Sequence, residues 1–488
     1  MTHPLSRRIA DVLTLDPQKP AIQYDGRWSS WADIDHLATQ LGELAVAHGG
    51  EHPRVAILLR NSPAHVAALL GVLRAGGTVV VVNPARGDAR TREDLAALAL
   101  PVVIGAAQDV SALVTPAPAT TVVTIGDLDS PAQVRAASAP THDPGRPGVA
   151  VWMLTSGTTG APKRVDLTYD MLARSVISDT RTPTALRRGV AIVNSPLVHV
   201  GGVFRVLLCI AEARAFVLLP KFELAQWAAA VREHRPRAVS LVPAALRMVL
   251  HSDLTRDDLD GVLAVTSGTA PLSADDADAF TEKFGIPVLT SYAATEFGGG
   301  VAAWTLADHK QYWLQKRGSV GRANPGAQLR VVADDGRPLD ADQPGLLEVK
   351  PAQLGPDAEW IRTTDLARID ADGFLWILGR ADQAIIRGGF KVLPDDVRAA
   401  LESHPAVAGA AVIGNPDERL GETPVAMVEL RAGLTTDAGE LTDYLRSRLA
   451  RYEIPTEIAV VDAIPRTPSG KPDLTAVRER LHALDSMR

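Results

Sequence analysis

One loop in the first half of the chain combines residue types that suit the binding of a polyphosphate. Residues Thr155–Lys163 read Thr-Ser-Gly-Thr-Thr-Gly-Ala-Pro-Lys and follow an apolar run at Val149–Met153, which we predict to be a strand. Glycines permit tight turns whose N–H groups face inward, and hydroxyls and a lysine add further donors. The loop is not a Walker A motif, because the Gly-Lys-Ser/Thr ending is missing. A plain surface loop is the competing interpretation, and the unbroken Ser/Thr/Gly run followed by Pro-Lys argues against it.

Length and composition describe the protein that must carry this loop. The chain has 488 residues, more than one ordinary compact domain holds, so we expect two or three folding units. The net charge of −7 gives no reason to expect nucleic acid or an anionic membrane as a partner. The single cysteine, Cys209, excludes an intramolecular disulfide, and its apolar neighbours at Val206–Ile210 predict a buried, inert thiol.

The sequence does not predict a membrane segment. Residues 1–20 lack the unbroken apolar core of a secretory signal. The two most apolar stretches, 65–83 and 200–220, are interrupted by charged residues such as Arg74 and Arg205, which favours a buried core over membrane insertion. We therefore expect a cytoplasmic protein without a membrane span.

Short β-branched runs alternate with helical patterns through the first half of the chain. Strand–helix–strand units of this spacing predict parallel sheets covered by helices, which is the α/β class. The expected strands are 54–59, 78–83, 191–195, 216–219 and 238–242, and the expected helices are 63–75 and 224–234. The segment Asp127–Gly148, rich in Ala, Pro, Asp and Ser, is expected to be a surface connection.

The pattern changes after about residue 320. Short strands at 327–333, 345–351 and 373–379, bounded by Asp-Gly and Pro-Gly turns, predict a β-rich subdomain of residues 320–379. A compact α+β pattern then follows, with helices at 394–403 and 437–449 and strands at 407–414, 425–430 and 457–461. We therefore expect a large unit of residues 1–379, a connection at 380–382 and a small unit of residues 383–488.

Thr155–Lys163 resembles the signature loop of adenylate-forming enzymes, the superfamily of acyl-CoA synthetases, peptide-synthetase adenylation domains and beetle luciferases. The resemblance extends from Pro20 to Asp473 and is nearest to the acyl-CoA synthetases. Further motifs follow in the family's order, and that ordered set is far more specific than one loop. They are Pro196–Gly202, Ser267–Pro271, Ser291–Glu296, Trp360–Asp365, Gly379–Asp382, Gly388–Val392 and Pro465–Lys471. The resemblance implies a mobile C-terminal domain and the use of ATP, Mg²⁺ and coenzyme A.

The resemblance also implies a nucleotide site. Tyr292 would stack on adenine, Asp365 would bond both ribose hydroxyls and Thr295 would contact the α-phosphate. Glu296 would hold Mg²⁺, a hard cation that prefers carboxylate and phosphate oxygens. Arg380 would contact ribose or phosphate. The implied set that binds ATP or AMP is Thr155, Ser156, Gly157, Thr158, Thr159, Gly160, Lys163, Gly268, Thr269, Ala270, Tyr292, Asp365 and Arg380.

Other implied roles concern the acid, the thiol and the movement between half-reactions. Lys471 would act with Thr295, Glu296 and Arg380 in forming the adenylate. Asp382 would be the hinge of the small domain, and Gly388, Gly389 and Lys391 would swing in to form the thiol tunnel. The candidates for the acyl pocket are His199, Val200, Gly201, Val203, Phe204 and Gly298. For His199 a purely structural role stays equally open.

The sequence departs from the family pattern at a few positions. Arg164, Ala293 and Thr364 stand where glycine is usual, and Tyr169 stands where histidine is frequent. None of these changes removes a group assigned to the chemistry, so adenylation is expected to survive. The effect of the Arg164 charge beside the phosphate loop is left open.

The resemblance favours an ATP-dependent carboxylic acid–CoA ligase that acts through an acyl-adenylate on an apolar aliphatic, aryl or alicyclic acid. Loading of a separate acyl carrier protein is the enzymatic alternative, and both a monomer and a homodimer are open. A non-catalytic nucleotide-binding regulator is the remote alternative. The presence of Lys163, Glu296, Asp365 and Lys471 argues against it.

Overall fold

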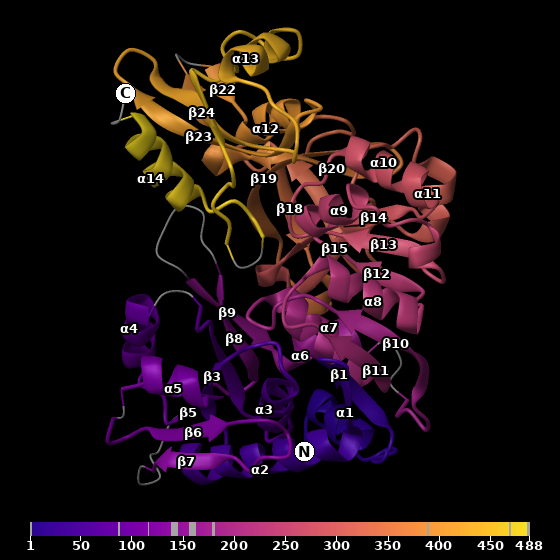
Figure 1. Ribbon diagram of the computed structural model, residues 1–488, viewed down its shortest axis with the longest axis vertical. Coiled ribbons are helices and arrows are strands. Elements are labelled where there is room, and N and C mark those ends of the chain that lie inside the picture. The colour runs from indigo at the N-terminus through magenta and orange to yellow at the C-terminus, as the bar shows by residue number, and fades with distance from the viewer. Residues whose placement is uncertain are drawn as a thin grey trace.

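The computed structural model describes residues 2–85, 88–115, 117–137, 145–155, 163–177, 181–387, 390–467 and 470–485. The N-terminal helix α1 (Pro4–Leu13) lies at one end of the molecule and the C-terminal elements lie at the other (Figure 1). Strands and helices alternate as expected, and the fold is α/β. No described helix is long and apolar enough to cross a membrane.

The first sheet carries the phosphate-loop candidate between its last two strands. Its order is β7 (Gln133–Ala136), β6 (Thr121–Ile125), β5 (Val102–Ala106), β3 (Arg54–Leu58), β4 (Thr78–Val82), β8 (Val149–Thr155) and β9 (Lys163–Thr168). The neighbours from β6 to β8 pair in parallel, whereas β7 and β9 pair antiparallel. The parallel strands are apolar on both faces because helices cover both. The helices α2 (Trp31–Gly49) and α3 (Pro63–Arg74) share a core with one face, and α4 (Asp88–Leu98) and α5 (Ala107–Leu113) share a core with the other.

A second sheet lies beside the first and supplies the nucleotide-binding candidates. Its order is β12 (Ala238–Ser240), β13 (Ala264–Ser267), β14 (Val288–Ala294), β15 (Gly299–Ala303) and β16 (Arg322–Ala323). The helices α8 (Leu224–His234), α9 (Pro243–Leu250) and α10 (Ala274–Phe284) share its main core. A further sheet joins β10 (Arg187–Val193), β11 (Arg214–Leu218), β1 (Pro20–Tyr24) and β2 (Arg27–Ser30).

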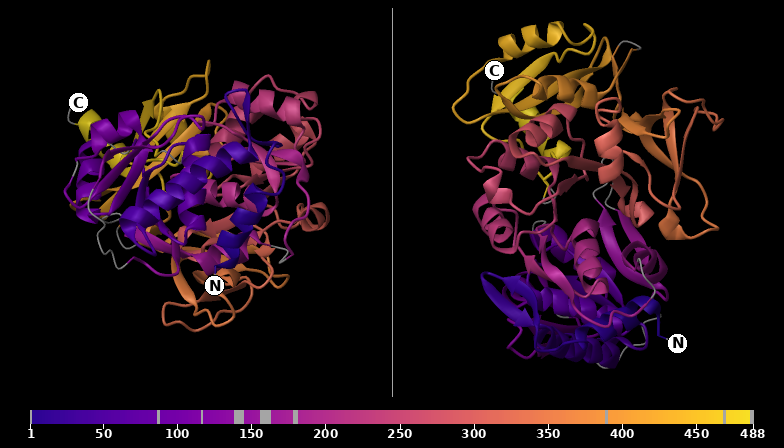
Figure 2. Two further views of the ribbon diagram at one scale, coloured as in Figure 1. Left: turned by 90° about the horizontal axis from the view of Figure 1, so that it is seen from below. Right: turned by 90° about the vertical axis from the view of Figure 1, so that its right-hand side faces the viewer.

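The expected β-rich subdomain is an antiparallel sheet of β17 (Gln328–Val332), β18 (Gly345–Lys350), β19 (Ile361–Ile369) and β20 (Leu375–Arg380). It projects to one side in the second view of Figure 2. The last part of the chain forms an α+β unit around β22 (Phe390–Val392), β21 (Ile385–Arg387), β24 (Gly421–Leu430), β23 (Val407–Asp417) and β25 (Glu457–Val461). Its helices are α12 (Pro394–Glu402), α13 (Ala438–Arg446) and α14 (Leu474–Asp485).

The structure confirms most of the expected elements and corrects some bounds. Helix α8 and strand β25 have the bounds that the sequence predicted, whereas β10 starts four residues earlier and β12 is shorter. The expectation of a plain connection at Asp127–Gly148 was wrong for residues 133–136, which form β7 at the edge of the first sheet. Cys209 is buried as expected, and burial raises its pKa to about 12, which leaves the thiol protonated and inert.

Candidate active site

Tyr292 and Asp365 meet between the second sheet and the β-rich sheet. Tyr292 comes from β14 and Asp365 from β19, and the tyrosine hydroxyl donates a hydrogen bond to the carboxylate. Burial raises the pKa of Asp365, while the hydrogen bond from Tyr292 and the charge of Arg380 act in the opposite direction. Burial and the neighbouring carboxylate also raise the pKa of Tyr292, so the hydroxyl remains a donor. The pair places a hydrogen-bond acceptor beside an aromatic ring, which suits a ribose and its base.

Arg380 stands directly opposite Asp365, because the two residues are register partners on β19 and β20. Its guanidinium donates to both oxygens of Asp382, at 2.9 and 2.7 Å, and to the hydroxyl of Thr364 at 2.6 Å. Thr364 replaces a glycine that is usual in the resembled family. The Thr364 hydroxyl therefore helps to orient Arg380, which a glycine at this position could not do.

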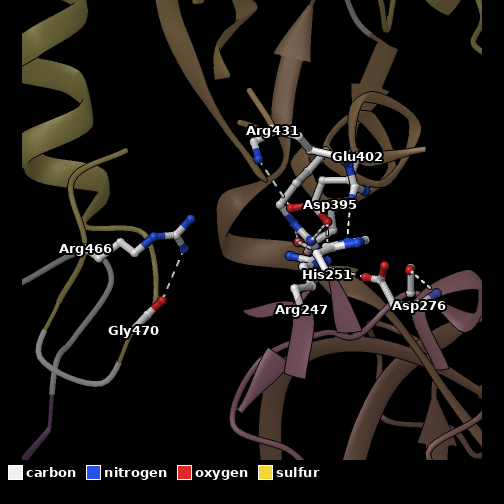
Figure 3. A network of polar contacts seen from close by, with 11 residues as sticks. Arg247, His251, Asp276, Asp395, Glu402, Arg431, Arg466 and Gly470 are labelled. Carbon is white, nitrogen blue, oxygen red and sulfur yellow. Dashed lines mark hydrogen bonds and ion pairs between the residues drawn. The ribbon is translucent and has the colours of Figure 1, made fainter. Parts of the chain in front are cut away.

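Lys471 reaches this group from the C-terminal unit. It follows a tight turn in which Gly470 has φ +81° and the Gly470 N–H donates to the Thr467 carbonyl at 2.8 Å. Arg466 donates to the Gly470 carbonyl at 3.3 Å (Figure 3). It also donates to Glu429 at 3.3 Å, which ties the turn to β24. The turn fixes the direction in which Lys471 leaves the backbone.

The surroundings of Lys471 identify the point at which the two units converge. Burial lowers the pKa of Lys471 and the charge of Arg380 lowers it further, whereas Asp365 and Glu296 act to raise it. The residue as a whole is exposed, so the nearby charges lower or raise the pKa of a side chain that solvent still reaches in part. A lysine from one unit therefore lies within electrostatic range of an arginine and two carboxylates from the other.

Thr295 and Glu296 lie on a short 3₁₀ turn (Thr295–Phe297) directly after β14. Glu296 is exposed and makes no ion pair or hydrogen bond with any residue that the structure describes. The described residues contain no group of three or more His, Cys, Asp or Glu side chains that would hold a metal on their own. A lone free carboxylate fits Mg²⁺ that is bound mainly by nucleotide phosphates and water, since this ion needs only one or two carboxylates in such sites.

A loop and a helix bring His199 towards Lys471. His199 is the N-cap residue of α7 (Val200–Ala211), and its buried Nε2 atom has no hydrogen-bond partner among the described residues. Burial lowers its pKa and the charge of Lys471 lowers it further, so the ring is neutral. Asn61 holds the preceding loop by donating to the carbonyls of Ser195 and Leu219 and by accepting from the Leu197 N–H at 2.8 Å.

The candidate residues for the acyl pocket do not all lie together. Val200, Gly201 and Phe204 lie on the partly exposed side of α7. Val203 is fully buried in the main core and does not share the partly exposed side of α7. Gly298 lies beside α6 (Tyr169–Val176), where an added Cβ would meet Met171 Cε at 2.8 Å.

Gly268, Thr269 and Ala270 follow the end of β13, next to the start of the Tyr292 motif. An added Cβ at Gly268 would lie 2.8 Å from the hydroxyl oxygen of Ser291, so this segment packs closely on β14. Thr269 has φ +72°, an uncommon backbone conformation for a residue with a side chain. The segment therefore lies beside the part of β14 that leads to Tyr292.

The phosphate-loop candidates mostly lie outside the described residues, as do Gly388 and Gly389 of the predicted thiol tunnel. Thr155 ends β8 and Lys163 begins β9, and the two are register partners at the base of the loop. Lys391 lies on β22. The adjacent Phe390 is exposed and stacks on Tyr452, with 4.6 Å between the two ring centroids.

Arg164 and Tyr169, two residues that depart from the family pattern, make contacts that support the fold. The Arg164 guanidinium donates to the Val81 carbonyl at 3.0 Å and to Asp94 of α4 at 2.5 Å, so a carboxylate of α4 balances its charge. The Tyr169 hydroxyl donates to the carbonyls of Gly77 at 2.7 Å and Leu73 at 3.1 Å. Both side chains tie the strand and helix that flank the loop to the rest of the first unit.

An interdomain network was missed by the sequence analysis. Arg247 on α9 donates to Asp276 on α10 at 2.7 Å and to Glu402 on α12 of the C-terminal unit at 2.9 Å (Figure 3). A second contact joins Arg431 of the same unit to the neutral ring of His251. Burial opposes the charge of Arg247, but the two carboxylates outweigh it and raise its pKa. We name Arg247, Asp276 and Glu402 the interdomain ion cluster; its partners are too far apart in sequence for any local pattern to indicate them.

Replacing Tyr292 with phenylalanine is expected to weaken ATP binding most at acid pH. The variant keeps the ring but removes the hydrogen bond that lowers the pKa of Asp365, so this pKa should rise and the carboxylate should be lost at a higher pH. Hydrogen bonds to charged groups contribute about 1.5–3 kcal/mol. We therefore expect the ATP dissociation constant to rise about tenfold or more at a pH at which Asp365 of the variant is protonated. Titration calorimetry across pH would measure the effect. Tyr444→Phe, which removes a hydroxyl remote from the site, is the control, and an equal pH profile for Tyr292→Phe and wild type would contradict the assignment.

A large unit of sheets and helices, followed by a small α+β unit whose lysine reaches the first, is the arrangement of adenylate-forming enzymes. The family described as AMP-binding enzyme matches residues 10–356, and the AMP-binding enzyme C-terminal domain matches residues 396–471. The chain therefore belongs to the AMP-binding enzyme family, and it is an AMP-forming acid–thiol ligase.

Individual relatives agree with this assignment. The chain is 30% identical to an indoleacetate–CoA ligase of Aromatoleum aromaticum (strain DSM 19018 / LMG 30748 / EbN1), over 95% of this chain and 96% of that one. It is also 30% identical to 4-coumarate–CoA ligase 1 of Oryza sativa subsp. japonica, over 93% and 88% of the two chains. Its fold is similar to that of ATP-bound MatB from Rhodopseudomonas palustris, with a TM-score of 0.83, 27% identity and coverage of 98% and 99%.

Proposed function

We propose that this enzyme joins a carboxylic acid with an apolar aliphatic, aryl or alicyclic body to coenzyme A in two half-reactions. The observation that carries the proposal is the convergence of Lys471 with Arg380, Asp365 and Glu296, because this collects the charges that an acid–ATP reaction needs. The similarity to ligases named for indoleacetate and 4-coumarate supports an acid of this kind and coenzyme A as the acceptor.

In the first half-reaction the substrate carboxylate attacks the α-phosphorus of ATP and pyrophosphate leaves. The carboxylate is ionised at neutral pH, so the enzyme needs no general base, and its task is to position the reactants and to balance charge. Asp365 and Tyr292 would hold the nucleoside, and Lys471, Arg380 and Thr295 would act on the phosphates. Mg²⁺, held by Glu296, would neutralise phosphate charge when bound.

In the second half-reaction the thiol of coenzyme A attacks the acyl carbon and AMP leaves. Lys471 occupies the site in the arrangement described, so we propose that the C-terminal unit rotates about Asp382 before the thiol arrives. This rotation would withdraw Lys471 and bring the segment 388–391 to the site. Asp382 lies in a 3₁₀ turn (Ala381–Gln383) between the β-rich sheet and the C-terminal sheet, which supports its assignment as the hinge.

Pyrophosphate release across a panel of indole, cinnamic, benzoic, alicyclic and fatty acids tests the first half-reaction. The proposal predicts release that depends on both ATP and one class of acid. ATP binding without pyrophosphate release for any acid would contradict it and would favour a regulatory nucleotide-binding protein.

Glu402→Gln is expected to slow adenylate formation about tenfold without slowing thioester formation from supplied acyl-adenylate. The change weakens the Arg247–Glu402 contact that holds the two units in the arrangement with Lys471 at the site. Charge-assisted hydrogen bonds contribute about 1.5–3 kcal/mol, and these side chains are 15% and 9% exposed, so little solvent screening applies. Stopped-flow measurement of the separate half-reactions gives the readout.

The control is Asp443→Asn, which breaks an exposed ion pair with Arg446 inside the C-terminal unit and should leave both half-reactions unchanged. Equal slowing of both half-reactions in Glu402→Gln would show that the interdomain ion cluster supports the fold and does not select the adenylating arrangement.

A further inference from the structure

Arg205 is a partly buried cation whose charge no described carboxylate balances. It lies on α7, and its guanidinium makes a single hydrogen bond, from Nη2 to the Thr266 hydroxyl on β13 at 3.1 Å. The described residues include no Asp or Glu within ion-pair distance of it. Burial lowers the pKa of the guanidinium, although the residue as a whole keeps some exposure to solvent.

Some buried or partly buried arginines of the described residues pair with carboxylates, whereas Arg8 and Arg387 donate to backbone carbonyls. Arg164 pairs with Asp94 at 2.5 Å, Arg74 pairs with Asp35 at 2.5 Å, and Arg247 pairs with two carboxylates. A buried charge is costly unless it is paired and hydrogen-bonded. Arg205 differs from both groups, because a single hydroxyl is its one hydrogen-bond partner among the described residues, and no carboxylate or carbonyl accepts from it there.

Arg205 faces the region where the acid would lie. It follows Gly201 by four residues, so both occupy one face of α7. An added Cβ at Gly201 would meet nothing within 4 Å, so this face borders open space. His199 is the N-cap residue of this helix, and its Nε2 atom has no hydrogen-bond partner among the described residues. At a rise of 1.5 Å per residue, Arg205 lies about 9 Å further along the helix axis than His199. The partner Thr266 lies immediately before the segment 267–270.

We propose that Arg205 binds a second carboxylate at the far end of the acid substrate, which makes the preferred substrate a dicarboxylic acid with an apolar spacer. This inference rests on the function proposed above and names its substrate class. One carboxylate would react beside Lys471 while the other pairs with the guanidinium. Val200 and Phe204, on the same partly exposed side of α7, would contact the spacer, and the Thr266 hydroxyl would hold the guanidinium in place.

The test compares matched acids in the pyrophosphate-release assay. The acids are linear α,ω-dicarboxylic acids of increasing length, with terephthalate as an aryl example. Each is compared with its monomethyl ester and with the monocarboxylic acid in which a methyl group replaces the second carboxylate, called here the acid that ends in methyl. Wild type should favour the dicarboxylic acid of one length in kcat/KM. Arg205→Met should lower kcat/KM for that acid about 10- to 100-fold, the range for loss of a charge-assisted hydrogen bond. It should raise kcat/KM for the acid that ends in methyl, because the partly buried charge is gone, and Arg205→Lys should keep part of the original preference.

Arg232→Met, which removes a half-exposed arginine of α8 that pairs with Asp258, is the matched control and should not change the preference. The proposal is overturned if wild type prefers the acids that end in methyl, or if Arg205→Met loses activity equally with all acids, which would make Arg205 a structural residue. In both cases pyrophosphate release by wild type would still support the proposed function. Absence of release with every acid would instead contradict the proposed function and this inference with it.

Discussion

Lys471→Ala is expected to lower the rate of adenylate formation a few hundredfold while sparing thioester formation from supplied acyl-adenylate. The ammonium lies within electrostatic range of Asp365, Glu296 and Arg380, and it would contact charge that develops on ATP only in the first half-reaction. Loss of one such contact in an enclosed site costs about 3–4 kcal/mol in the transition state. Single-turnover measurement of pyrophosphate release and of AMP release would separate the two half-reactions.

The control for this prediction is Lys310→Ala, an exposed lysine on α11 (Leu306–Tyr312). It should leave both half-reactions at the wild-type rate. If Lys471→Ala slowed both half-reactions equally, the lysine would be holding the C-terminal unit in place and would not be acting on the phosphates.

Asp382→Pro is expected to show the opposite pattern, with adenylate formed and its conversion to the thioester lost. Asp382 lies in a 3₁₀ turn, whose φ angles are close to the value of about −65° that proline imposes, so the described arrangement should tolerate the change. A rotated arrangement needs different angles at the hinge, and proline in a conformation that it cannot adopt costs about 3 kcal/mol or more, which is about a hundredfold in rate. One burst of pyrophosphate per site, without acyl-CoA, is the expected result.

Asp382→Ala separates the backbone effect from the loss of the contact with Arg380. It removes the carboxylate that accepts from Arg380 but leaves the backbone free, so thioester formation should continue. Steady-state production of acyl-CoA at the wild-type rate by Asp382→Pro would show that the hinge lies elsewhere.

The fold followed from sequence because local pattern and tertiary environment agree. The apolar run at β4 (Thr78–Val82) is buried along its whole length between helices on both faces, as parallel strands require. The edge strand β7 was missed because its short Gln-Val-Arg-Ala sequence is mostly exposed and has no apolar run, and only its pairing with β6 makes it a strand. Tertiary pairing of this kind leaves no periodic signal in a short segment.

The site was predictable as a set of motifs but not as a geometry. Pairing of β19 with β20 places Asp365 opposite Arg380, and this follows from a register that two distant motifs do not reveal. The Arg247–Glu402 contact joins residues 155 positions apart, and Arg205 lies in a segment for which the sequence predicted only a buried core. The burial of Val203 could not be predicted, because helical spacing alone does not tell which face of α7 points to the core.

The central claim is that one enzyme makes an acyl-adenylate and passes the acyl group to coenzyme A. The direct measurement is a single-turnover experiment in which enzyme, ATP and an accepted acid first release pyrophosphate, and excess coenzyme A is then added to the isolated enzyme–adenylate complex. Our account predicts AMP and acyl-CoA in equal amounts, both in proportion to the adenylate formed. Release of AMP with free acid, or discharge of the adenylate by an acyl carrier protein but not by coenzyme A, would contradict it.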